Sequence, residues 1–459
     1  MKKYRLSAIL IKIKRAIVPL SLVFLLSSCA TLPKAQSHID VMLNSQQYPQ
    51  AITMLKDNPQ LYGKKNELLY LFDKGLAEHL NQEYQASIET FAKAQQKFDQ
   101  LYTESLTKIA ATWVINDYAV PYHGEDFEHV FINMFQALNY LMLGEYREAL
   151  VEARDVDSTL NAINFQYQDD QKNVYKEDAF IRLLMGIIYE IEPVSSSIND
   201  AYISYIKAEK IYDNDYNPNY GLRTPEILKE NILSTARFMG LIEYSKYRNK
   251  FKLSEFLSQK EKRKKAEVYL IQYNGFSRIK TEATVTVPLV DGHIVKVAFP
   301  EYKKRAYAIE KSRLLAKSKL GKVYQGSSEL VQDIGAIAQK NLDRRKIRYI
   351  AKSALRATGR YLFEKKQKEN IKKNRGDIAA SLFSFVSNMY NIVVEQADLR
   401  CWQTLPDQIR LARLIIEPGD YEFTLENFNE SGSYLSEIKL DPHTLISGQK
   451  LFIIVRTLQ

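Results

Sequence analysis

The hydrophobic residues of this chain follow two different periods, and the change between them comes near residue 250. From Ser37 to Asn249, apolar residues recur at three- and four-residue spacing without a convincing alternating stretch, which predicts helix after helix. After residue 265, apolar and polar residues alternate in short segments, which is typical of half-buried strands. The sequence therefore predicts an α+β protein, helical in its first half and β-rich in its second.

Three tyrosines mark a weak repeat inside the helical region. Tyr48, Tyr84 and Tyr146 are each followed three residues later by a small residue, and Gly75 and Ala137 stand nine residues before the second and third of these tyrosines. We expect the small residues to let two antiparallel helices approach closely, with the tyrosine over the turn between them. A helical bundle with coincidental spacing is the alternative.

These spacings resemble the tetratricopeptide repeat, which stacks helical hairpins into an array. A fourth, imperfect copy runs through Gly186 and Tyr205, with the turn enlarged by the EPVSSSIND loop. Because the units lie at irregular distances, we expect a degenerate array over residues 37–250. Stacks of this kind generally offer a concave surface to a protein or peptide.

Seven strands are predicted in the second half, three in residues 265–300 and four in residues 397–459, with turns such as Asn274-Gly275 between them. Residues 301–396 are predicted to form a basic helical insertion. A three-stranded set buries little alone, so one β-sandwich interrupted by the insertion is the economical arrangement; two separate small β units are the alternative. The uncharged residues 378–394 are marginal as a membrane span and are expected to be buried.

The N-terminus has the organisation of a secretory signal. Residues 1–15 carry six positive charges and no acid, and the short apolar run AIVPLSLVFLL follows. Because the segment ends in Leu26-Ser27-Ser28-Cys29, it resembles a bacterial lipoprotein signal. That resemblance implies removal of residues 1–28, lipidation of Cys29 by a diacylglycerol and an N-acyl chain, and a linker over residues 29–36. An ordinary signal peptide with a chance cysteine is the alternative.

The compartment constrains the partners. Alanine follows Cys29, where aspartate would resemble an inner-membrane retention signal, so we expect the outer membrane, with the protein facing the periplasm. Removal of residues 1–28 takes six positive charges from the net charge of +10 and leaves +4, a mild excess that does not favour nucleic acid. With Cys29 lipidated, Cys401 has no intramolecular partner, and it is either a buried, inert thiol or a reactive or intermolecular one.

The stretch YHGEDFEHV at residues 122–130 concentrates residue types that ligate metals. His123 and His129 are six residues apart, about 240° around a helix, so they cannot share a face. Glu125 and His129 can pair, but two ligands leave a transition metal under-coordinated. The alternative fits better: a turn precedes a new helix, and Asp126 and its acidic neighbours complement the dipole of the first turn.

Motifs that carry other chemistry are absent from the sequence. It has no Gly-x-Ser-x-Gly elbow, no Gly-rich phosphate loop and no Cys-x-x-Cys, so we expect neither an enzyme nor a cofactor. Basic clusters are expected to be solvated faces, with contact to lipid head groups, lipopolysaccharide phosphates or an acidic partner as the alternative. They lie at Lys260–Lys265, Lys303–Arg305, Arg344–Lys352 and Lys365–Arg375.

Three blocks of sequence carry a family resemblance: VPYHGEDFEHVFINMFQALNYLMLGEYREALVEAR, YNGFSRIKTE with the following VAFPEY, and ADLRCWQTLPDQIRLARLIIEPGDYEFTL. Together they resemble a family of uncharacterised bacterial lipoproteins with tetratricopeptide-like helices and a β-rich C-terminal region. The resemblance implies a periplasm-facing lipoprotein and supplies no reaction. Serine is usual in that family where Cys401 stands, which argues against a required thiol.

The sequence also suggests where a partner binds. Asp398, Arg400 and Trp402 alternate, so on an extended segment they present one Arg–aromatic surface; the alternative is that Trp402 fills the sandwich core while Arg400 pairs with Asp398. The candidate partner-binding surface comprises His123, Glu125, Asp126, His129, Arg400 and Trp402.

The expected function is a non-enzymatic outer-membrane lipoprotein that acts as a scaffold for a periplasmic or envelope protein through its helical array. Cell-wall glycan and anionic lipid are candidate further contacts. The alternatives are a structural subunit of an envelope secretion or motility complex, and a cell-wall or lipid-modifying enzyme.

Overall fold

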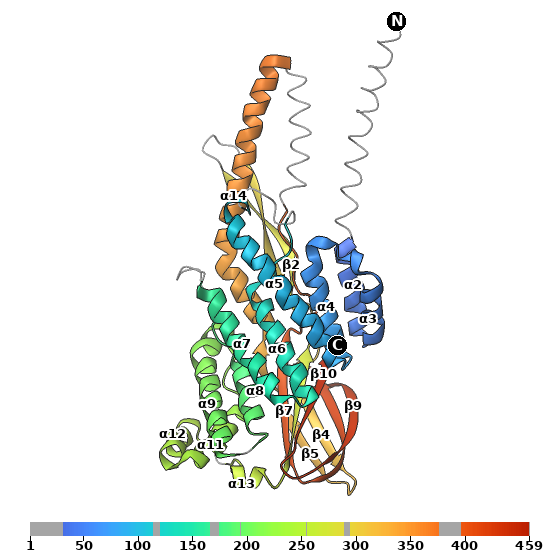
Figure 1. Cartoon of the computed structure of the whole chain (residues 1–459), viewed down its shortest axis with the longest axis vertical. Coiled ribbons are helices and arrows are strands. Elements are labelled where there is room, and N and C mark those ends of the chain that lie inside the picture. The colour runs from blue at the N-terminus through green and yellow to red at the C-terminus, as the bar shows by residue number, and fades with distance from the viewer. Residues whose placement is uncertain are drawn as a thin grey trace.

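The computed structural model describes residues 31–112, 120–165, 174–192, 194–253, 255–288, 294–375 and 396–458. Its class is the predicted α+β, with a helical first half followed by a C-terminal β domain (Figure 1). The predicted signal peptide, Cys29 and the uncharged residues 378–394 lie outside the described residues. No described helix is both long and apolar enough to cross a membrane.

Most described helices pack as consecutive pairs. The pairs are α2 (Thr31–Asn44) with α3 (Tyr48–Asp57), α4 (Glu67–Leu80) with α5 (Tyr84–Thr112), α6 (Asp126–Leu143) with α7 (Tyr146–Phe165), α8 (Ala179–Tyr189) with α9 (Ser195–Ile211), and α11 (Glu226–Met239) with α12 (Leu241–Phe251). Short helical segments lie between some of these pairs: η2 (Pro59–Leu61), η3 (Lys64–Asn66), η5 (Tyr212–Tyr216) and α10 (Asn217–Tyr220). Another, α13 (Gln259–Lys262), follows the last pair and precedes the first strand. Since α2 begins at Thr31, the linker expected over residues 29–36 is wrong from that residue on; Pro33 is tolerated because it lies in the first turn.

The residues of the weak repeat occupy equivalent places in these pairs. Tyr48, Tyr84 and Tyr146 are the first residues of α3, α5 and α7. A Cβ atom at Gly75 would lie 2.8 Å from the ring of Phe91, and one at Gly186 would collide with the ring of Tyr205. At both glycines, the absence of a side chain is therefore what lets two helices of one pair approach, as the spacing predicted.

The strands form two four-stranded sheets and a ribbon. The inner sheet has the order β10 (Lys450–Thr457), β1 (Ala266–Asn274), β7 (Gln408–Ile416) and β6 (Glu329–Asp333), with β10 parallel to β1 and the other neighbours antiparallel. The outer sheet has the order β5 (Val323–Ser327), β4 (Lys311–Ser318), β8 (Gly419–Phe428) and β9 (Tyr434–Leu445). The ribbon of β2 (Ile279–Pro288) and β3 (Ile294–Lys303) packs against the long helix α14 (Ile334–Arg375).

The two predicted β segments meet in one sandwich through β1 alone, because the other two strands of the first segment, β2 and β3, form the separate ribbon. All seven predicted strands are present, and β1 from the first segment pairs with β7 and β10 from the second. The prediction of helix throughout residues 301–396 is wrong for residues 301–303, which end β3, and for residues 311–333, in which β4, β5 and β6 lie. Leu314 and Ala316 of β4 point into the sandwich between basic residues, so the strand alternates, but its lysine and arginine content resembles an exposed helix.

Strand β1 shows how the layers are arranged. Ala266, Val268 and Leu270 belong to the core between the two sheets, whereas Tyr269, Ile271 and Tyr273 belong to the core shared with the helices. Because successive side chains of a strand point to opposite faces, β1 is buried on both. The body therefore has three layers: the helices, the inner sheet and the outer sheet (Figure 1).

Candidate functional site

The stretch YHGEDFEHV starts helix α6. Gly124 has φ +79°, a left-handed conformation that favours glycine, and Glu125 is the N-cap residue of α6. Glu125 and Glu128 form a capping box, in which each carboxylate accepts a hydrogen bond from a backbone N–H at the helix start. The predicted turn and acid-rich helix start are confirmed.

The carboxylate of Glu128 joins this helix start to the segment before β7. One of its oxygens, Oε1, accepts a 2.6 Å hydrogen bond from the backbone N–H of Trp402, and Oε2 accepts a 2.7 Å bond from the hydroxyl of Tyr122. Burial, with the nearby Glu125 charge, raises the pKa of Glu128 to about 7 against the opposing hydrogen bonds. In the sequence, Glu128 was indistinguishable from any other acid of a first helical turn.

Trp402 and Arg400 are buried, so the prediction that they present a surface to a partner is wrong. Trp402 stacks on Phe72 of α4, with ring centroids 4.4 Å apart. Arg400 makes two hydrogen bonds to Asp398, of 2.8 and 2.7 Å. The predicted Arg400–Asp398 pair is confirmed, whereas Trp402 fills the core of the helices rather than that of the sandwich.

The two histidine rings of the stretch do not contact each other; the ring of His129 contacts the backbone of His123. His129 is buried, and its Nε2 lies 3.1 Å from the carbonyl oxygen of His123, so Nε2 carries the proton and donates it. Burial lowers the pKa of His129 to about 3. His129 is thus also removed from the predicted partner surface, and His123 remains exposed. Among the described residues, no group of three or more His, Cys, Asp or Glu could hold a metal ion.

Glu125 and Asp126 lie at the edge of the same junction and are both ion-paired. Glu125 binds Lys280 of β2, and Asp126 binds Arg345 of α14. Burial alone would lower the pKa of Lys280, but the Glu125 carboxylate and other groups near it, among them Asp398, together outweigh burial and raise that pKa. These ion pairs therefore connect the ribbon and α14 to the start of α6. The predicted partner surface is mainly an internal junction.

Cys401 lies in the same segment. Its side chain is buried, and burial raises the pKa of the thiol to about 12. A thiol with so small a thiolate fraction is a weak nucleophile, which agrees with the buried, inert alternative.

A second junction joins the helices to the inner sheet through buried charges. Lys262 donates a 2.6 Å hydrogen bond to Glu190, which directly follows α8, and Lys450 of β10 is ion-paired with both Glu190 and Glu267. Burial would raise the pKa of Glu267, but Lys262 and Lys450 outweigh it and lower that pKa. Lys262 belongs to the run Lys260–Lys265 predicted to be exposed, and for Lys262 that prediction is wrong.

Two more polar contacts connect the layers between these junctions. Ring nitrogen Nε2 of His79 in α4 lies 3.0 Å from the hydroxyl of Tyr273 in β1. Gln332 of β6 donates a 2.6 Å hydrogen bond to Asp178, the N-cap residue of α8. Together with the shared core, they show that the chain's own sheet covers the inner side of α4, α6 and α8. Partner binding on that side, as expected for a concave repeat surface, is therefore not available in this structure.

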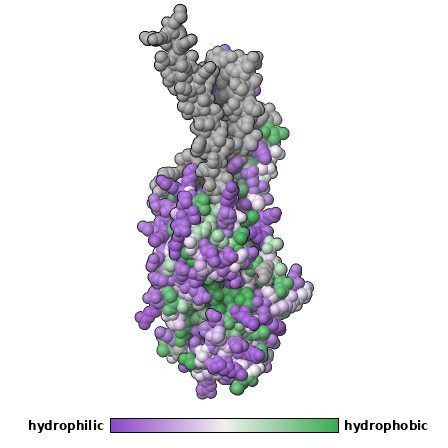
Figure 2. Space-filling model, turned by 90° about the vertical axis from the view of Figure 1, so that its right-hand side faces the viewer, coloured by the Kyte–Doolittle hydropathy of each residue, from purple (hydrophilic) through white to green (hydrophobic). Residues whose placement is uncertain are grey.

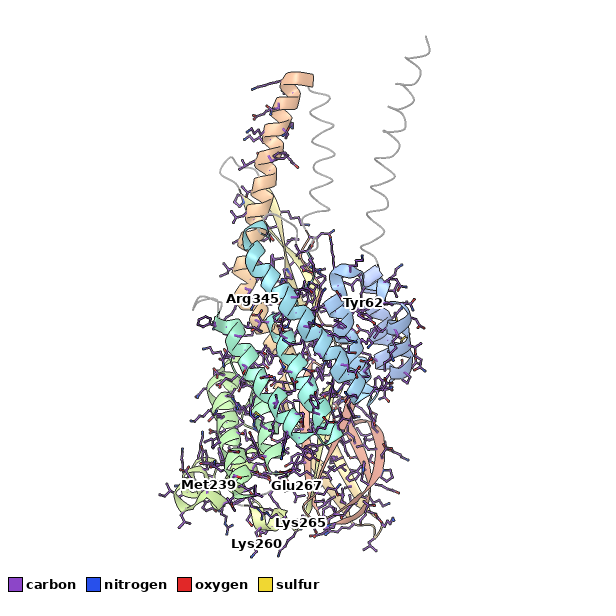
Figure 3. All side chains as sticks on the ribbon, in the orientation of Figure 1. Tyr62, Met239, Lys260, Lys265, Glu267 and Arg345 are labelled. Atoms are coloured by element: carbon purple, nitrogen blue, oxygen red, sulfur yellow. The ribbon has the colours of Figure 1, made fainter. Side chains whose placement is uncertain are left out.

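An exposed apolar surface lies elsewhere, at the turn between α11 and α12. Four hydrophobic residues surround Gly240 there, and we call Phe238, Met239, Leu241 and Ile242 the apolar turn. The exposed fractions of Leu241 and Ile242 are 83% and 86%. Gly240 has φ +142°, which lets one residue reverse the chain between the two helices. Figure 3 places Met239 at the end of the body opposite to the free end of α14.

Sequence reasoning missed this turn, although a signal was present. The run FMGLI at residues 238–242 interrupts the alternation of apolar and polar residues expected of surface helices. Figure 2, which views the side of the body that carries α2, α3 and β9, shows mostly hydrophilic residues and one contiguous hydrophobic area near the middle of the body. The apolar turn is a run of consecutive exposed hydrophobic residues, and such a run is a candidate interaction site.

Comparison of the sequence with protein-family models and with curated proteins gives no match.

Proposed function

We propose that this chain is a non-enzymatic lipoprotein of the outer membrane, which faces the periplasm and binds a protein partner through the apolar turn. The observation that carries the proposal is the exposure of Leu241 and Ile242 in a turn otherwise flanked by charged residues such as Arg237 and Lys246. When a partner removes apolar surface of this kind from water, the complex is stabilised by about 25 cal/mol per Å².

The proposed anchor rests on the lipoprotein-like end of the signal. Cys29 lies two residues before Thr31, where α2 begins. Two residues span at most about 7 Å, so a lipid on Cys29 would hold α2 close to the membrane surface. In Figure 1, α2 lies in the upper half of the body and α11 and α12 lie at its lower end, so the apolar turn would be directed into the periplasm.

The junctions support a scaffold role for the body. Buried hydrogen bonds and ion pairs connect the helices to the inner sheet from Glu128 at one place to Lys262 at another. Breaking a buried pair by removing one partner typically costs about 3–5 kcal/mol, so the two halves resist separation. A rigid body of this kind fixes the anchor and the apolar turn at a constant separation.

A photo-crosslinking amino acid at Leu241 in intact cells tests the partner site. We expect a crosslinked protein product from position 241 and none from the exposed Leu320, in the turn between β4 and β5. The Ile242→Asp substitution should abolish the product, since it places a charge in the interface. Equal products from both positions, or products insensitive to Ile242→Asp, would contradict the site. Stoichiometric recovery of a large assembly would instead favour a structural subunit of an envelope complex.

Fractionation tests the anchor independently. After a high-salt wash, which removes electrostatic contacts with head groups, the Cys29→Ser variant should be absent from the membrane fraction and appear in the soluble periplasmic fraction, because a cysteine thiol is needed for the thioether-linked lipid. Unchanged fractionation of this variant would overturn the lipoprotein proposal.

A further inference from the structure

Helix α14 carries an unusual concentration of positive charge. Its 42 residues include fourteen lysines and arginines and three acids, a net charge of +11. The chain after residue 28 carries +4, which is the total of +10 less the six positive charges of the signal. Everything after residue 28 outside α14 therefore sums to −7. The basic excess of this protein is the property of one helix.

The two ends of α14 differ in their surroundings. Ile334, Ile337 and Ala338 are buried in the core of the body. Near the middle, Lys346 pairs with Glu301 of β3. Toward the C-terminal end the side chains are exposed, and Figure 1 shows this part of the helix rising above the other described elements.

Exposed lysines and exposed apolar residues occur together on the projecting part. Lys366, Lys368 and Lys373 are exposed. The exposed fractions of Leu355, Leu362 and Phe363 are 61%, 56% and 63%. At 100° per residue these three apolar positions fall within about 100° of one another. Clusters of lysine and arginine attract anionic lipid head groups, and the exposed apolar side chains among them add contact with the head-group boundary.

The position of α14 in the molecule agrees with such a contact. Figure 1 shows α14 projecting from the upper half of the body, where α2 also lies. A lipid on Cys29 would bring this half toward the membrane. Because the rest of the chain is net negative, an anionic surface would repel it and attract α14, which favours one orientation.

We propose that the projecting part of α14 lies against the anionic phospholipid head groups of the membrane that holds the anchor. The inference rests on the proposed lipoprotein function. Lysine side chains meet phosphate groups there, and exposed apolar side chains such as Leu362 add contact with the head-group boundary. Two attachments, the lipid and α14, fix the tilt of the body and keep the apolar turn away from the membrane.

Vesicle binding by the protein without its lipid tests this directly. The chain from residue 29 with Cys29→Ser retains every described residue and cannot be acylated. We expect it to bind phosphatidylcholine vesicles that contain phosphatidylglycerol at least about tenfold more tightly than pure phosphatidylcholine vesicles. Binding should weaken as salt rises from 0.05 to 0.5 M, because the Debye length shortens from about 14 to about 4 Å.

Two matched charge-reversal variants locate the contact. Lys366→Glu/Lys368→Glu/Lys373→Glu should lower the affinity for the anionic vesicles by about tenfold or more. Lys317→Glu/Lys322→Glu/Lys439→Glu changes the net charge equally through exposed lysines of the outer sheet, and it should retain the affinity. Circular dichroism checks that both variants are folded.

Each other outcome overturns the proposal. Equal binding to the two kinds of vesicle removes the head-group contact, and equal loss in both variants assigns the effect to net charge. If vesicle binding by the α14 variant is unchanged but crosslinks from α14 to an acidic protein are lost in cells, the occupant is that protein. None of these results depends on the lipid, so they are separable from the Cys29→Ser fractionation result.

Discussion

The backbone N–H of Trp402 donates a 2.6 Å hydrogen bond to Glu128, a residue 274 positions earlier in the chain. Glu128 lies in the first turn of α6, and Trp402 precedes the first strand of the C-terminal β segment. The indole ring of Trp402 lies in the helical core, where it stacks on Phe72. One buried carboxylate thus connects two of the sequence blocks that carry the family resemblance, so these blocks meet in an internal junction.

Truncation of Trp402 should destabilise both halves of the protein. We expect Trp402→Ala to lower the free energy of unfolding by about 3–5 kcal/mol, since it removes a fully buried indole from the helical core. Trp402→Phe keeps an aromatic ring against Phe72 and should cost less. Denaturant unfolding followed by circular dichroism measures both, and equal stability of the alanine variant and the natural protein would contradict the packing described.

Asp73 should make stability depend on pH. Its carboxylate accepts 2.6 Å hydrogen bonds from Tyr62 and Thr404, yet burial raises its pKa from 3.8 to about 7. The folded state therefore holds this proton more tightly than the unfolded state. The stabilisation is complete below about pH 4 and is lost as the pH rises through about 7.

The Asp73→Asn variant isolates that contribution. Its neutral amide can still bond both hydroxyls, because each hydroxyl donates or accepts. As the pH rises from 4 to 8, we expect the free energy of unfolding of the variant to increase relative to that of the natural protein by as much as about 4 kcal/mol. Denaturant unfolding at each pH measures it. The exposed Glu89→Gln variant is the control and should follow the natural protein. An Asp73→Asn profile parallel to the natural one would refute the assignment.

Two glycine-to-alanine variants should have opposite effects. At Gly186 a Cβ atom would overlap the ring of Tyr205, so Gly186→Ala forces α8 and α9 apart and should cost about 2 kcal/mol or more. At Gly359, within α14, nothing lies within 4 Å of the added atom. Gly359→Ala should be neutral or stabilise by up to about 1 kcal/mol, from helix propensity alone. Thermal unfolding of the two variants distinguishes them, and a tolerated alanine at position 186 would count against close packing of that pair.

Cys401 should not react in the folded protein. Because burial raises the pKa of its thiol to about 12, little thiolate exists at pH 8 and a maleimide cannot reach it. In a Cys29→Ser background, mass spectrometry should detect labelling of Cys401 only in denaturant. A cysteine placed at the exposed Leu320 is the positive control and should be labelled in the folded state. Rapid labelling of Cys401 without denaturant would restore the reactive alternative.

The sequence was most informative where one residue's immediate neighbours decide its structure. The capping acids and Gly124 predicted the start of α6, and the tyrosines predicted the turns that precede α3, α5 and α7. Alternation predicted seven strands correctly. It failed in β4, where basic residues stand on both sides of Leu314 and Ala316 and the composition suggested a helix. Pairing with β8 decides the structure there, and that strand lies about a hundred residues away.

The candidate site could not be predicted in the same way. Arg400, Trp402 and His129 have the residue types of a binding surface, and in sequence nothing shows that Phe72 or Asp398 lies beside them. The apolar turn was missed for the opposite reason. Leu241 and Ile242 would be core residues in most helices, and only the packing of α11 and α12 leaves them exposed.

By itself, the sequence determined the period of each segment, the helix starts and the charge of α14, because local sterics, capping and composition act over a few residues. Tertiary structure alone decided which faces are covered. The inner sheet closes over α4, α6 and α8, because Tyr269, Ile271 and Tyr273 of β1 need a second apolar layer. That contact turns the predicted binding surface into an internal junction, whereas the apolar turn and the projecting part of α14 stay exposed.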